Sequence, residues 1–553
     1  MSSRTLTVAT ALTVALAGTA ALGQSERPDE NALFGGGDEK PAQADTPTAS
    51  PSPDRPSEDA LFGEDPAPSA NADASNTGDA VERQPSLTEA PPEPGDRDGT
   101  ALSGPGTRSA FDSNEAVDDP LQIGGQFYLR GFAAATEGTS FGNTSFAAPT
   151  LVDGYFDARP MERLRGFVVG RLSYDPTVPT ATDANAPSNP RVLLDQAWLR
   201  FDFDRTVFFT VGKQHVKWGS AQIWNPTDFL SPQRRNPLAF VDLRTGVSMV
   251  KVHVPWEAKG WNFYGIAVID DLGTDTGALV DNNTGGLPTE PTEPTAPTQP
   301  PPEAVERPVN RLSRIGGALR AEVVMGPAEL AVSVVAQRGR KPRFGFDLSS
   351  AVGPIDVYGE LGLKKGTDQP LYRLPAGATV EDIIKGDATV EEYHPSGLTP
   401  QVTAGANYSF GYGDNDLAVL GVEYFYNSTG YTSSLGYPFL MRQNAFQPLY
   451  IGQHYTSAYL FLNDPGPLER TSFNLFTLGN LSDKSYISRL NVTHRALSYL
   501  TLEAYGAVHY GHKGGEFRMG FTVPELVVDG RTIPGYTIPT PTFELGVGLR
   551  ISL

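Results

Sequence analysis

Histidine and acidic side chains are the residues of this sequence that could carry acid–base or metal chemistry. The seven histidines are His215, His253, His394, His454, His494, His509 and His512. None of them has the spacing of a helical metal site or of a nucleophile and its base. Glu503 and His509 share one face of a predicted strand, but six residues of strand span about 20 Å. There is no cysteine. We therefore expect no catalytic residue, no metal site and no cofactor.

The elements that would position any functional group are short alternating segments, which fill the chain after Pro120. Residues 402–412, 500–510 and 543–553, for example, place apolar residues at every second position. About eighteen such segments follow one another. This alternation is the weak signature of a transmembrane β-barrel, but a soluble antiparallel sheet also alternates.

The lengths of the connections decide between the two architectures. Short connections, such as residues 204–206, 326–328 and 353–354, alternate with long ones. The long connections are residues 175–190, 219–246, 271–310, 365–400 and 428–453. Short periplasmic turns that alternate with long external loops are the plan of outer-membrane barrels. Residues 121–553 therefore predict an all-β, antiparallel, up-and-down barrel of about eighteen strands, which has both of its ends in the periplasm.

Polar positions on the predicted strands should face the lumen of this barrel. The candidates for the pore lining are Arg130, Arg159, Arg165, Arg171, Arg200, Asp202, Lys251, Arg320, Arg489 and Arg550. Charges of both signs on one wall are costly in a dry core and ordinary around water. About eighteen strands is also the size that leaves an aqueous channel. A lumen that is plugged and has no transport role stays open as an alternative.

The predicted strand that ends near residue 214 changes its character at Gly212. Lys213, His215 and Lys217 follow at positions where apolar residues had been. We expect a β-bulge near Gly212 that turns them away from lipid, and an interfacial girdle that contains Trp218 and Trp224. The loop that follows either caps the rim or folds inward as a constriction. Its candidate constriction residues are Asp228, Arg234, Arg235, Asp242 and Arg244.

Two short motifs resemble those of bacterial outer-membrane barrels. GKQ at 212–214, WG at 218–219 and NPTD at 225–228 resemble a motif of uncharacterised porin-like barrels from Gram-negative bacteria. Residues 543–553 resemble the C-terminal signature strand of such barrels, with Leu553 in place of the more usual phenylalanine. The second resemblance implies recognition by the barrel-assembly machinery, and both imply a place in outer-membrane lipid.

The N-terminal region differs in composition from the rest of the chain. Residues 1–23 have one early arginine, an apolar run and a small-residue cleavage pattern, which predict a signal peptide rather than a membrane anchor. Residues 24–120 have 22 acidic and 6 basic residues, which account for 16 of the 21 net negative charges. Such a segment buries too little apolar surface to fold, so we expect a disordered periplasmic tail.

The tail contains a repeated motif. RPDENALFG at 27–35 recurs as RPSEDALFG at 55–63, with seven of nine positions identical. The repeat is either a neutral duplication or a docking motif for a periplasmic protein or cell-wall partner. In the second case its anchors would be Leu33, Phe34, Leu61 and Phe62, and two linked motifs would gain avidity.

The sequence therefore predicts a porin-like channel for the passive passage of small polar solutes across the outer membrane of a Gram-negative bacterium. The alternative is a structural or tethering protein, in which the barrel is an anchor and the tail binds the partner. No phosphate-binding loop or basic tract for nucleic acid is present.

Overall fold

A computed structural model describes residues 120–553, apart from residues 141–143, 179–188, 233, 240–241, 243, 271, 273–314, 376, 379–381, 383–387, 413–415, 444, 524–525, 529–530 and 534–535. The predicted signal peptide, the acidic tail and the docking candidates Leu33, Phe34, Leu61 and Phe62 lie outside the described residues.

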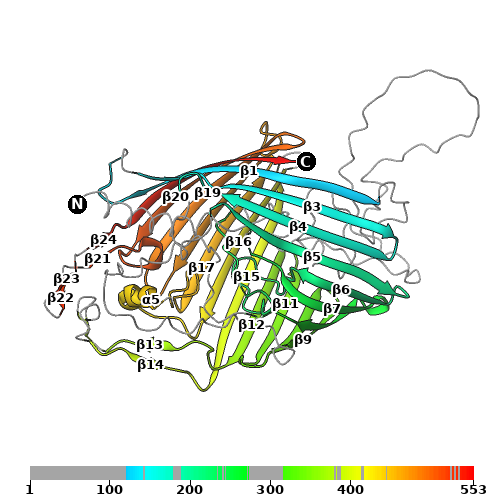
Figure 1. The fold of residues 1–553 in the computed structure, drawn as a ribbon, viewed down its shortest axis with the longest axis horizontal. Coiled ribbons are helices and arrows are strands. Elements are labelled where there is room, and N and C mark those ends of the chain that lie inside the picture. Colours follow the sequence, from blue (N-terminus) through cyan, green and yellow to red (C-terminus); the bar gives the residue numbers. More distant parts are fainter. Residues whose placement is uncertain are drawn as a thin grey trace, which may run out of the picture.

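Eighteen antiparallel strands of the described chain form a closed barrel (Figure 1). They are β1 (Leu121–Thr136), β3 (Thr150–Met161), β4 (Leu164–Tyr174), β5 (Arg191–Phe203), β6 (Val207–Gln214), β7 (Val247–Trp256), β8 (Trp261–Val268), β9 (Gly316–Met325), β10 (Ala328–Ala336), β11 (Arg343–Val352), β12 (Ile355–Lys365), β15 (Leu398–Tyr412), β16 (Asp416–Asn427), β17 (His454–Asn463), β18 (Thr471–Asn480), β19 (Ser485–Leu497), β20 (Leu500–Gly511) and β25 (Pro541–Ser552). Each strand pairs with its neighbour in sequence, and β25 pairs with β1 to close the sheet. The predicted up-and-down topology and strand number are confirmed.

The connections alternate in length around the barrel as the sequence predicts. The turn end of the barrel carries connections such as Asp204–Thr206 between β5 and β6, and the start of β1 and the end of β25 lie there too. The loop end carries the long connections and their small elements (Figure 1). These elements are β2 (Ser145–Ala147), β13 (Leu371–Arg373), β14 (Glu391–Tyr393), η5 (Ser434–Gly436), α5 (Tyr437–Arg442), η6 (Glu516–Arg518), β21 (Phe521–Val523), β22 (Leu526–Val528), β23 (Arg531–Ile533) and β24 (Tyr536–Ile538). A single 3₁₀ turn, η3 (Glu257–Lys259), joins β7 to β8 at the turn end.

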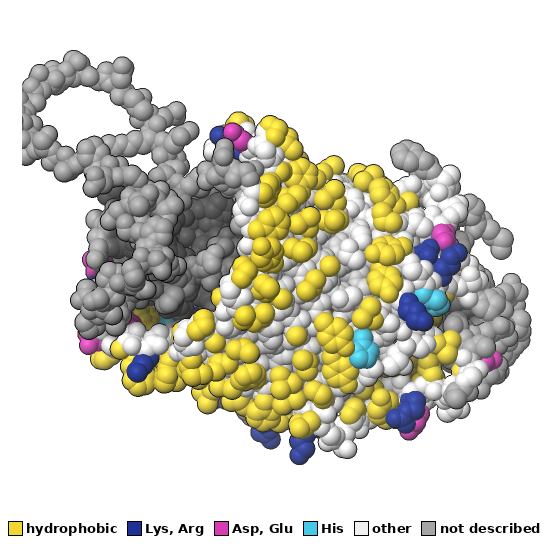
Figure 2. All heavy atoms as spheres, turned by 180° about the vertical axis from the view of Figure 1, so that it is seen from behind, with side chains coloured by type: hydrophobic (Ala, Val, Ile, Leu, Met, Phe, Trp, Pro, Cys, Tyr) yellow, Lys and Arg dark blue, Asp and Glu magenta, His cyan; other side chains and the backbone are white. Residues whose placement is uncertain are grey.

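Exposure alternates along each wall strand and distinguishes its two faces. On β25, Leu545 and Val547 are 51% and 65% exposed, whereas Glu544 and Arg550 are 3% and 7% exposed. The exterior seen in Figure 2 is largely hydrophobic, and few charged side chains interrupt it. An apolar exterior and a polar interior are the arrangement of a barrel that spans a bilayer with its strands. No helix among the described residues has the length and apolar character that a bilayer crossing requires.

The bulge expected near Gly212 lies instead on the neighbouring strand. Strand β6 pairs with β5 and β7 without a shift of register, although Gly212 has a positive φ of 128°. The extra residue is Asp195 of β5, opposite the step from Val169 to Gly170 in β4. Lys213 therefore stays on the outward-facing phase. Its flexible stem brings the ammonium to the carbonyl oxygen of Leu194, to which it donates a hydrogen bond of 2.7 Å.

Tyrosine rings cover glycines on the lumen side of neighbouring strands. Tyr459 of β17 is the direct register partner of Gly421 of β16, and a Cβ at position 421 would overlap the Tyr459 ring. Tyr505 covers Gly546 and Tyr358 covers Gly405 in the same way. An aromatic ring that covers a cross-strand glycine restores packing that the glycine lacks. These pairs favour the observed register.

Substitution of Gly421 tests this role of the tyrosine–glycine pairs. We expect Gly421→Ala to destabilise the barrel by about 1–3 kcal/mol, because the added methyl group overpacks the site. The measurement is the temperature at which the detergent-solubilised barrel loses its compact, heat-modifiable form on a gel. Gly170→Ala is the matched control, since nothing lies within 4 Å of a Cβ at that position. Equal midpoints for the two variants would contradict the proposed role.

Candidate functional site

The site is built around residues 215–246, which connect β6 to β7 and which we call the inner loop. Two carboxylates of the opposite wall hold its backbone. Glu423 of β16 accepts hydrogen bonds from the backbone N–H groups of Gln222, Ile223 and Trp224, at 2.9, 3.2 and 2.8 Å. Since residue 423 faces the lumen, the inner loop lies inside the barrel. The cap over the outer rim that the sequence left open is therefore not the arrangement in the structure.

Glu360 of β12 is the second anchor of the inner loop. Its carboxylate accepts the N–H of Ala221 at 2.6 Å and the hydroxyl of Thr227 at 2.8 Å. It also accepts the backbone N–H of Thr227 at 3.2 Å. A buried carboxylate is tolerated where several donors converge on it. Glu360 and Glu423 therefore fix the loop segment 221–227 by hydrogen bonds.

Glycines let the inner loop approach the wall closely. A Cβ on Gly362 of β12 would lie 2.5 Å from the carbonyl oxygen of Pro226. A Cβ on Gly345 of β11 would lie 3.0 Å from the ring of Phe229. Gly219 has a φ of 99°, and a side chain there would overlap Glu360. Glycine at these three positions is required by contact or by conformation.

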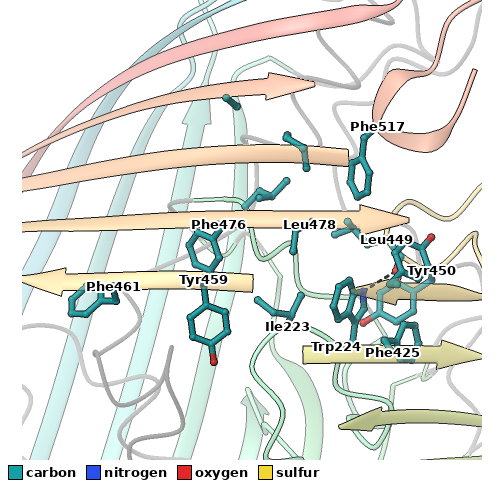
Figure 3. Close-up of a cluster of buried hydrophobic side chains, with 14 of the residues drawn as sticks. Ile223, Trp224, Phe425, Leu449, Tyr450, Tyr459, Phe461, Phe476, Leu478 and Phe517 are labelled. Atoms are coloured by element: carbon teal, nitrogen blue, oxygen red, sulfur yellow. Dashed lines mark hydrogen bonds between the residues drawn. The ribbon is translucent and has the colours of Figure 1, made fainter. Parts of the chain in front are cut away.

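The two loop tryptophans lie in the lumen and not in an interfacial girdle, so that prediction is wrong. Trp218 is 3% exposed and Trp224 is fully buried. The Trp224 ring stacks on Phe425 at 5.7 Å and contacts Tyr455 at 5.5 Å between centroids (Figure 3). Its indole N–H donates to the carbonyl oxygen of Leu449 at 2.9 Å. The indole thus joins the inner loop to the loop that follows β16.

Apolar packing attaches the inner loop to two stretches of wall. One cluster contains Ile223, Trp224 and Leu238 with lumen-facing residues of β16–β20 (Figure 3). The other contains Val216, Trp218, Phe229 and Leu230 with lumen-facing residues of β7–β10. The loop therefore has a packed core of its own on the inside of the barrel.

The returning part of the inner loop is held by ion pairs. Arg244 contacts Asp242 at 2.6 Å and Asp228 at 3.3 Å. Arg171 of β4 donates to the Asp242 carbonyl oxygen at 3.0 Å and pairs with Asp153 at 2.9 Å. Burial alone would raise the pKa of Asp242, but the Arg244 guanidinium holds it below its usual range. Three of the five constriction candidates, Asp228, Asp242 and Arg244, thus pair with one another.

The base of the inner loop carries two further titratable groups. His215 contacts the Asp195 carboxylate, the extra residue of the β5 bulge, at 2.8 Å. Burial, together with the nearby cations Arg235 and Arg244, lowers the pKa of Lys217 to about 8. Burial also raises the pKa of Asp228, which Arg244 opposes. The charge of this region therefore depends on pH in the mildly alkaline range.

Arg234 and Arg235 differ from the other constriction candidates. The Arg234 guanidinium lies over the Tyr450 ring, with its carbon 4.4 Å from the centroid. Arg235 donates to the Gln222 carbonyl oxygen at 3.4 Å. Among the described residues, neither arginine forms an ion pair with a carboxylate. Asp228 and Asp242 could have neutralised them from nearby in the sequence, but both are engaged by Arg244.

All ten pore-lining candidates lie on the inward-facing phase of their strands. Several are paired with carboxylates across the wall: Arg165 with Asp157 at 2.9 Å, Arg320 with Asp347 at 2.7 Å and Arg550 with Glu503 at 3.0 Å. Arg159 also pairs with Asp157, Asp202 lies 3.9 Å from Arg163, and Arg171 belongs to the network above. Arg130 and Arg489 lie over the rings of Tyr128 and Tyr505. Arg200 lies on β5 opposite Thr210, and Lys251 lies on β7 opposite the same residue.

The residues that the sequence missed are the anchors of the inner loop. Glu360 and Glu423 occupy polar positions of alternating segments, which assigns them to the lumen but to no partner. Both are glutamates on strands whose lumen face also carries glycine, at Gly362 and Gly421. The two anchors share a lumen-facing glycine two residues away, but the loop backbone approaches only Gly362, whereas the Tyr459 ring covers Gly421.

Several histidines of the described chain have structural partners. His509 contacts Glu544 at 3.0 Å through Nε2 and the carbonyl oxygen of Phe517 at 2.6 Å through Nδ1. His253 contacts Asn262 at 2.9 Å. In the part of the chain that the structure describes, no three His, Asp or Glu side chains gather in a way that could hold a metal ion.

Comparison with known proteins finds similarity only among solved structures. No protein-family model matches the sequence, and no curated protein does. The crystal structure of OccK11 (OpdR) from Pseudomonas aeruginosa shares 8% identity with this chain, covers 78% of it and 96% of its own length, and gives a TM-score of 0.41. OccAB1 from Acinetobacter baumannii shares 10% identity over 78% and 97% of the two chains, with a TM-score of 0.42. A triple mutant of the Rhodopseudomonas blastica porin shares 10% identity over 78% and 100%, with a TM-score of 0.35.

Removal of the Glu423 carboxylate tests its role as an anchor. We expect Glu423→Ala to leave the barrel closed but to release the backbone of residues 222–224. A loss of about 1–3 kcal/mol from the hydrogen-bond network predicts roughly 5- to 150-fold faster amide exchange there. Hydrogen–deuterium exchange of the peptide that spans residues 221–227, followed by mass spectrometry, measures it.

The matched control is Asp202→Ala. Asp202 is another inward-facing carboxylate, but it lies at the turn end, where it accepts the Arg205 N–H at 2.9 Å. Exchange in residues 221–227 should not change in this variant. If the two variants exchange at the same rate in this peptide, Glu423 does not anchor the loop.

Proposed function

We propose that the protein is a porin-like channel of the outer membrane, through which small polar solutes pass by diffusion. The observation that carries this proposal is a closed barrel whose inner wall bears charges of both signs, among them Arg171, Arg320 and Arg550 with their carboxylate partners. Such a wall is stable around water and costly in a dry core. An eighteen-strand barrel belongs to the size class that encloses an aqueous channel.

The inner loop supports a constriction within this channel. It reaches from β6 to the opposite wall at Glu360 and Glu423, and so reduces the cross-section of the lumen. Arg234 and Arg235 would add positive charge beside the solute path, because Asp228 and Asp242 form their ion pairs with Arg244. Low-dielectric walls focus the field of such charges on passing ions. We infer a channel that favours anions where it is narrowest.

The N-terminal residues and the C-terminal strand would direct export and assembly. The chain would be exported by residues 1–23 and folded by the barrel-assembly machinery, which would read the C-terminal strand. The turn end would face the periplasm, as would the acidic residues 24–120. The motif at residues 212–228 supports a relation to porin-like barrels of Gram-negative bacteria.

A tethering protein is the second candidate, because the RPxExALFG motif occurs twice in the N-terminal region. In that case Leu33, Phe34, Leu61 and Phe62 would bind a periplasmic protein or a cell-wall partner, and the barrel would serve as an anchor. The two candidates predict different electrical behaviour of the isolated barrel.

Conductance of the purified full-length protein in planar bilayers separates the two functions. We expect stepwise openings in potassium chloride, because a water-filled lumen with fixed charges of both signs conducts ions. The proposed channel is refuted by a barrel that inserts and is correctly folded but stays electrically silent. That result would favour the tether.

Charge removal at the constriction gives a second electrical prediction. Arg234→Ala combined with Arg235→Ala should shift the ion selectivity towards cations, as measured by the reversal potential in a salt gradient. The shift should be larger in dilute salt, because the Debye length grows from about 10 Å at 0.1 M to about 30 Å at 0.01 M.

The control removes two arginines from a connection at the loop end. Arg338→Ala with Arg340→Ala changes the net charge equally, but Arg338 is exposed on the short connection between β10 and β11. This variant should change the reversal potential much less. Identical shifts in the two double variants would show that Arg234 and Arg235 do not lie at the constriction.

A further inference from the structure

The outer wall of the barrel changes its chemistry where β19 and β20 reach the loop end. Farther towards the turn end, the outward residues of these strands include Leu490, Leu502 and Val508, all of them exposed. Tyr486 of β19 and Tyr510 of β20 come next and are direct register partners. Their rings stack at 5.4 Å between centroids. A tyrosine pair above an aliphatic surface is typical of the level at which hydrocarbon gives way to lipid headgroups.

Two basic side chains lie immediately beyond the tyrosine pair. Lys484 precedes Tyr486 by two residues, and His512 follows Tyr510 by two residues. The backbone N–H of His512 donates to the carbonyl oxygen of Lys484 at 2.9 Å, so the two residues lie side by side. Both are exposed. Two residues of strand span about 7 Å, which places the two side chains at the level of the headgroups.

The inner side of this turn is already filled. Asp483 and Ser485, the neighbours of Lys484, are both buried. The Asp483 carboxylate accepts the N–H of Glu516 at 2.7 Å, and the Ser485 hydroxyl accepts the N–H of Phe517 at 3.0 Å. Since η6 thus packs against the lumen side of the turn, the exposed side chain of Lys484 is left on the outer side. Figure 2 shows cationic and histidine side chains on the exterior near the loop end.

Positive charge is in excess at this place. Among the described residues, the side chains of Lys484 and His512 form no ion pair and no hydrogen bond. The adjacent Lys513 contacts the Glu137 carboxylate at 2.8 Å, but Arg518 contacts the same carboxylate at 2.9 Å. One carboxylate therefore serves two cations, and the Lys513 side chain is still 64% exposed.

A lipid phosphate matches this arrangement. Lipid phosphates lie at the headgroup level and attract each basic residue near the membrane surface. An ammonium and an imidazole that lie side by side can donate to two oxygens of one phosphate group. The acyl chains of the same lipid would cover the aliphatic wall below the tyrosines. Free phosphate would use only the polar half of this surface.

We propose that Lys484, His512 and Lys513 bind the phosphate group of a membrane lipid in the leaflet that surrounds the loop end. The lipid chains lie along Leu490 and Val508, and the tyrosine pair separates them from the headgroup. The site is on the outer wall, so it does not depend on the channel function proposed above.

Native mass spectrometry of the full-length protein in a neutral detergent tests the site. The probes are dioleoyl phosphatidic acid and dioleoylglycerol, which differ only in the phosphate group. We expect phosphatidic acid to bind about 25- to 125-fold more tightly, because each of two or three basic residues near a lipid phosphate contributes about 5-fold. Equal affinities for the two lipids would refute the site.

Substitutions assign the preference to the named residues. Lys484→Gln with His512→Gln should weaken the binding of phosphatidic acid about 5- to 25-fold. It should leave dioleoylglycerol binding and the heat-modifiable form of the barrel unchanged, because both side chains are exposed. Lys259→Gln is the matched control, since Lys259 is an exposed lysine of η3 at the turn end. The control should keep the full preference for phosphatidic acid.

Two outcomes of this series contradict the site. The first is a preference that survives in the double variant, and the second is an equal loss in Lys259→Gln, which would show a general attraction of the protein for anionic lipid. Inorganic phosphate in large excess, at constant ionic strength, should not displace phosphatidic acid. Displacement would assign the basic residues to free phosphate and refute the lipid as the occupant.

Bilayer conductance keeps the lipid site separate from the channel function. A silent barrel that prefers phosphatidic acid supports the site and refutes the channel. A conducting barrel without the preference refutes the site alone.

Discussion

Two wall carboxylates, Glu360 and Glu423, determine the shape of the lumen. Together they accept five backbone N–H groups and one hydroxyl from residues 221–227 of the inner loop. A carboxylate in this position would be costly without donors, and the loop backbone would be costly without acceptors. The carboxylates and the loop backbone therefore depend on each other. If the loop left the wall, the carboxylates and the loop N–H groups would both lose their hydrogen-bond partners.

Other features of the interior depend on this attachment. With residues 221–227 fixed, Trp224 is placed against Phe425, and its N–H reaches Leu449 in the loop after β16. Glu516, in the connection between β20 and β25, is linked to the same loop. Its carboxylate accepts hydrogen bonds from the N–H of Leu449 and from the hydroxyl of Tyr455, the latter at 2.7 Å. Three long connections are thus linked through buried polar contacts.

The alternation of residue types was sufficient to predict the wall of the barrel. It predicted the strands at 402–412, 500–510 and 543–553, the alternation of connection lengths and the inward face of every pore-lining candidate. These features are local, because a strand that separates lipid from water must alternate whatever its neighbours are. The strand count followed from the same periodicity.

The interior could not be predicted in the same way, because it depends on contacts between residues far apart in the sequence. Trp224 and Trp218 follow a strand end, where an interfacial girdle and a lumenal core need the same residue types. Only Glu423, about 200 positions away, distinguishes the two. The bulge was misplaced for a related reason. Lys213 looked incompatible with the outward phase, but its stem reaches the Leu194 carbonyl oxygen without any shift of register.

The interior combines two chemically different walls, and the inner loop crosses between them. Strands β3, β4, β9 and β11 contribute paired charges such as Arg171 with Asp153 and Arg320 with Asp347. Strands β16–β19 contribute a largely aromatic and apolar surface. Ile223 and Trp224 pack on the second wall, while Asp242 and Arg244 contact the first.

The loop contacts both walls through residues near its two ends. Its middle, which contains Arg234 and Arg235, is left without ion pairs to carboxylates among the described residues. The absence of an ion pair at Arg234 and Arg235 among the described residues is therefore a consequence of how the loop is anchored.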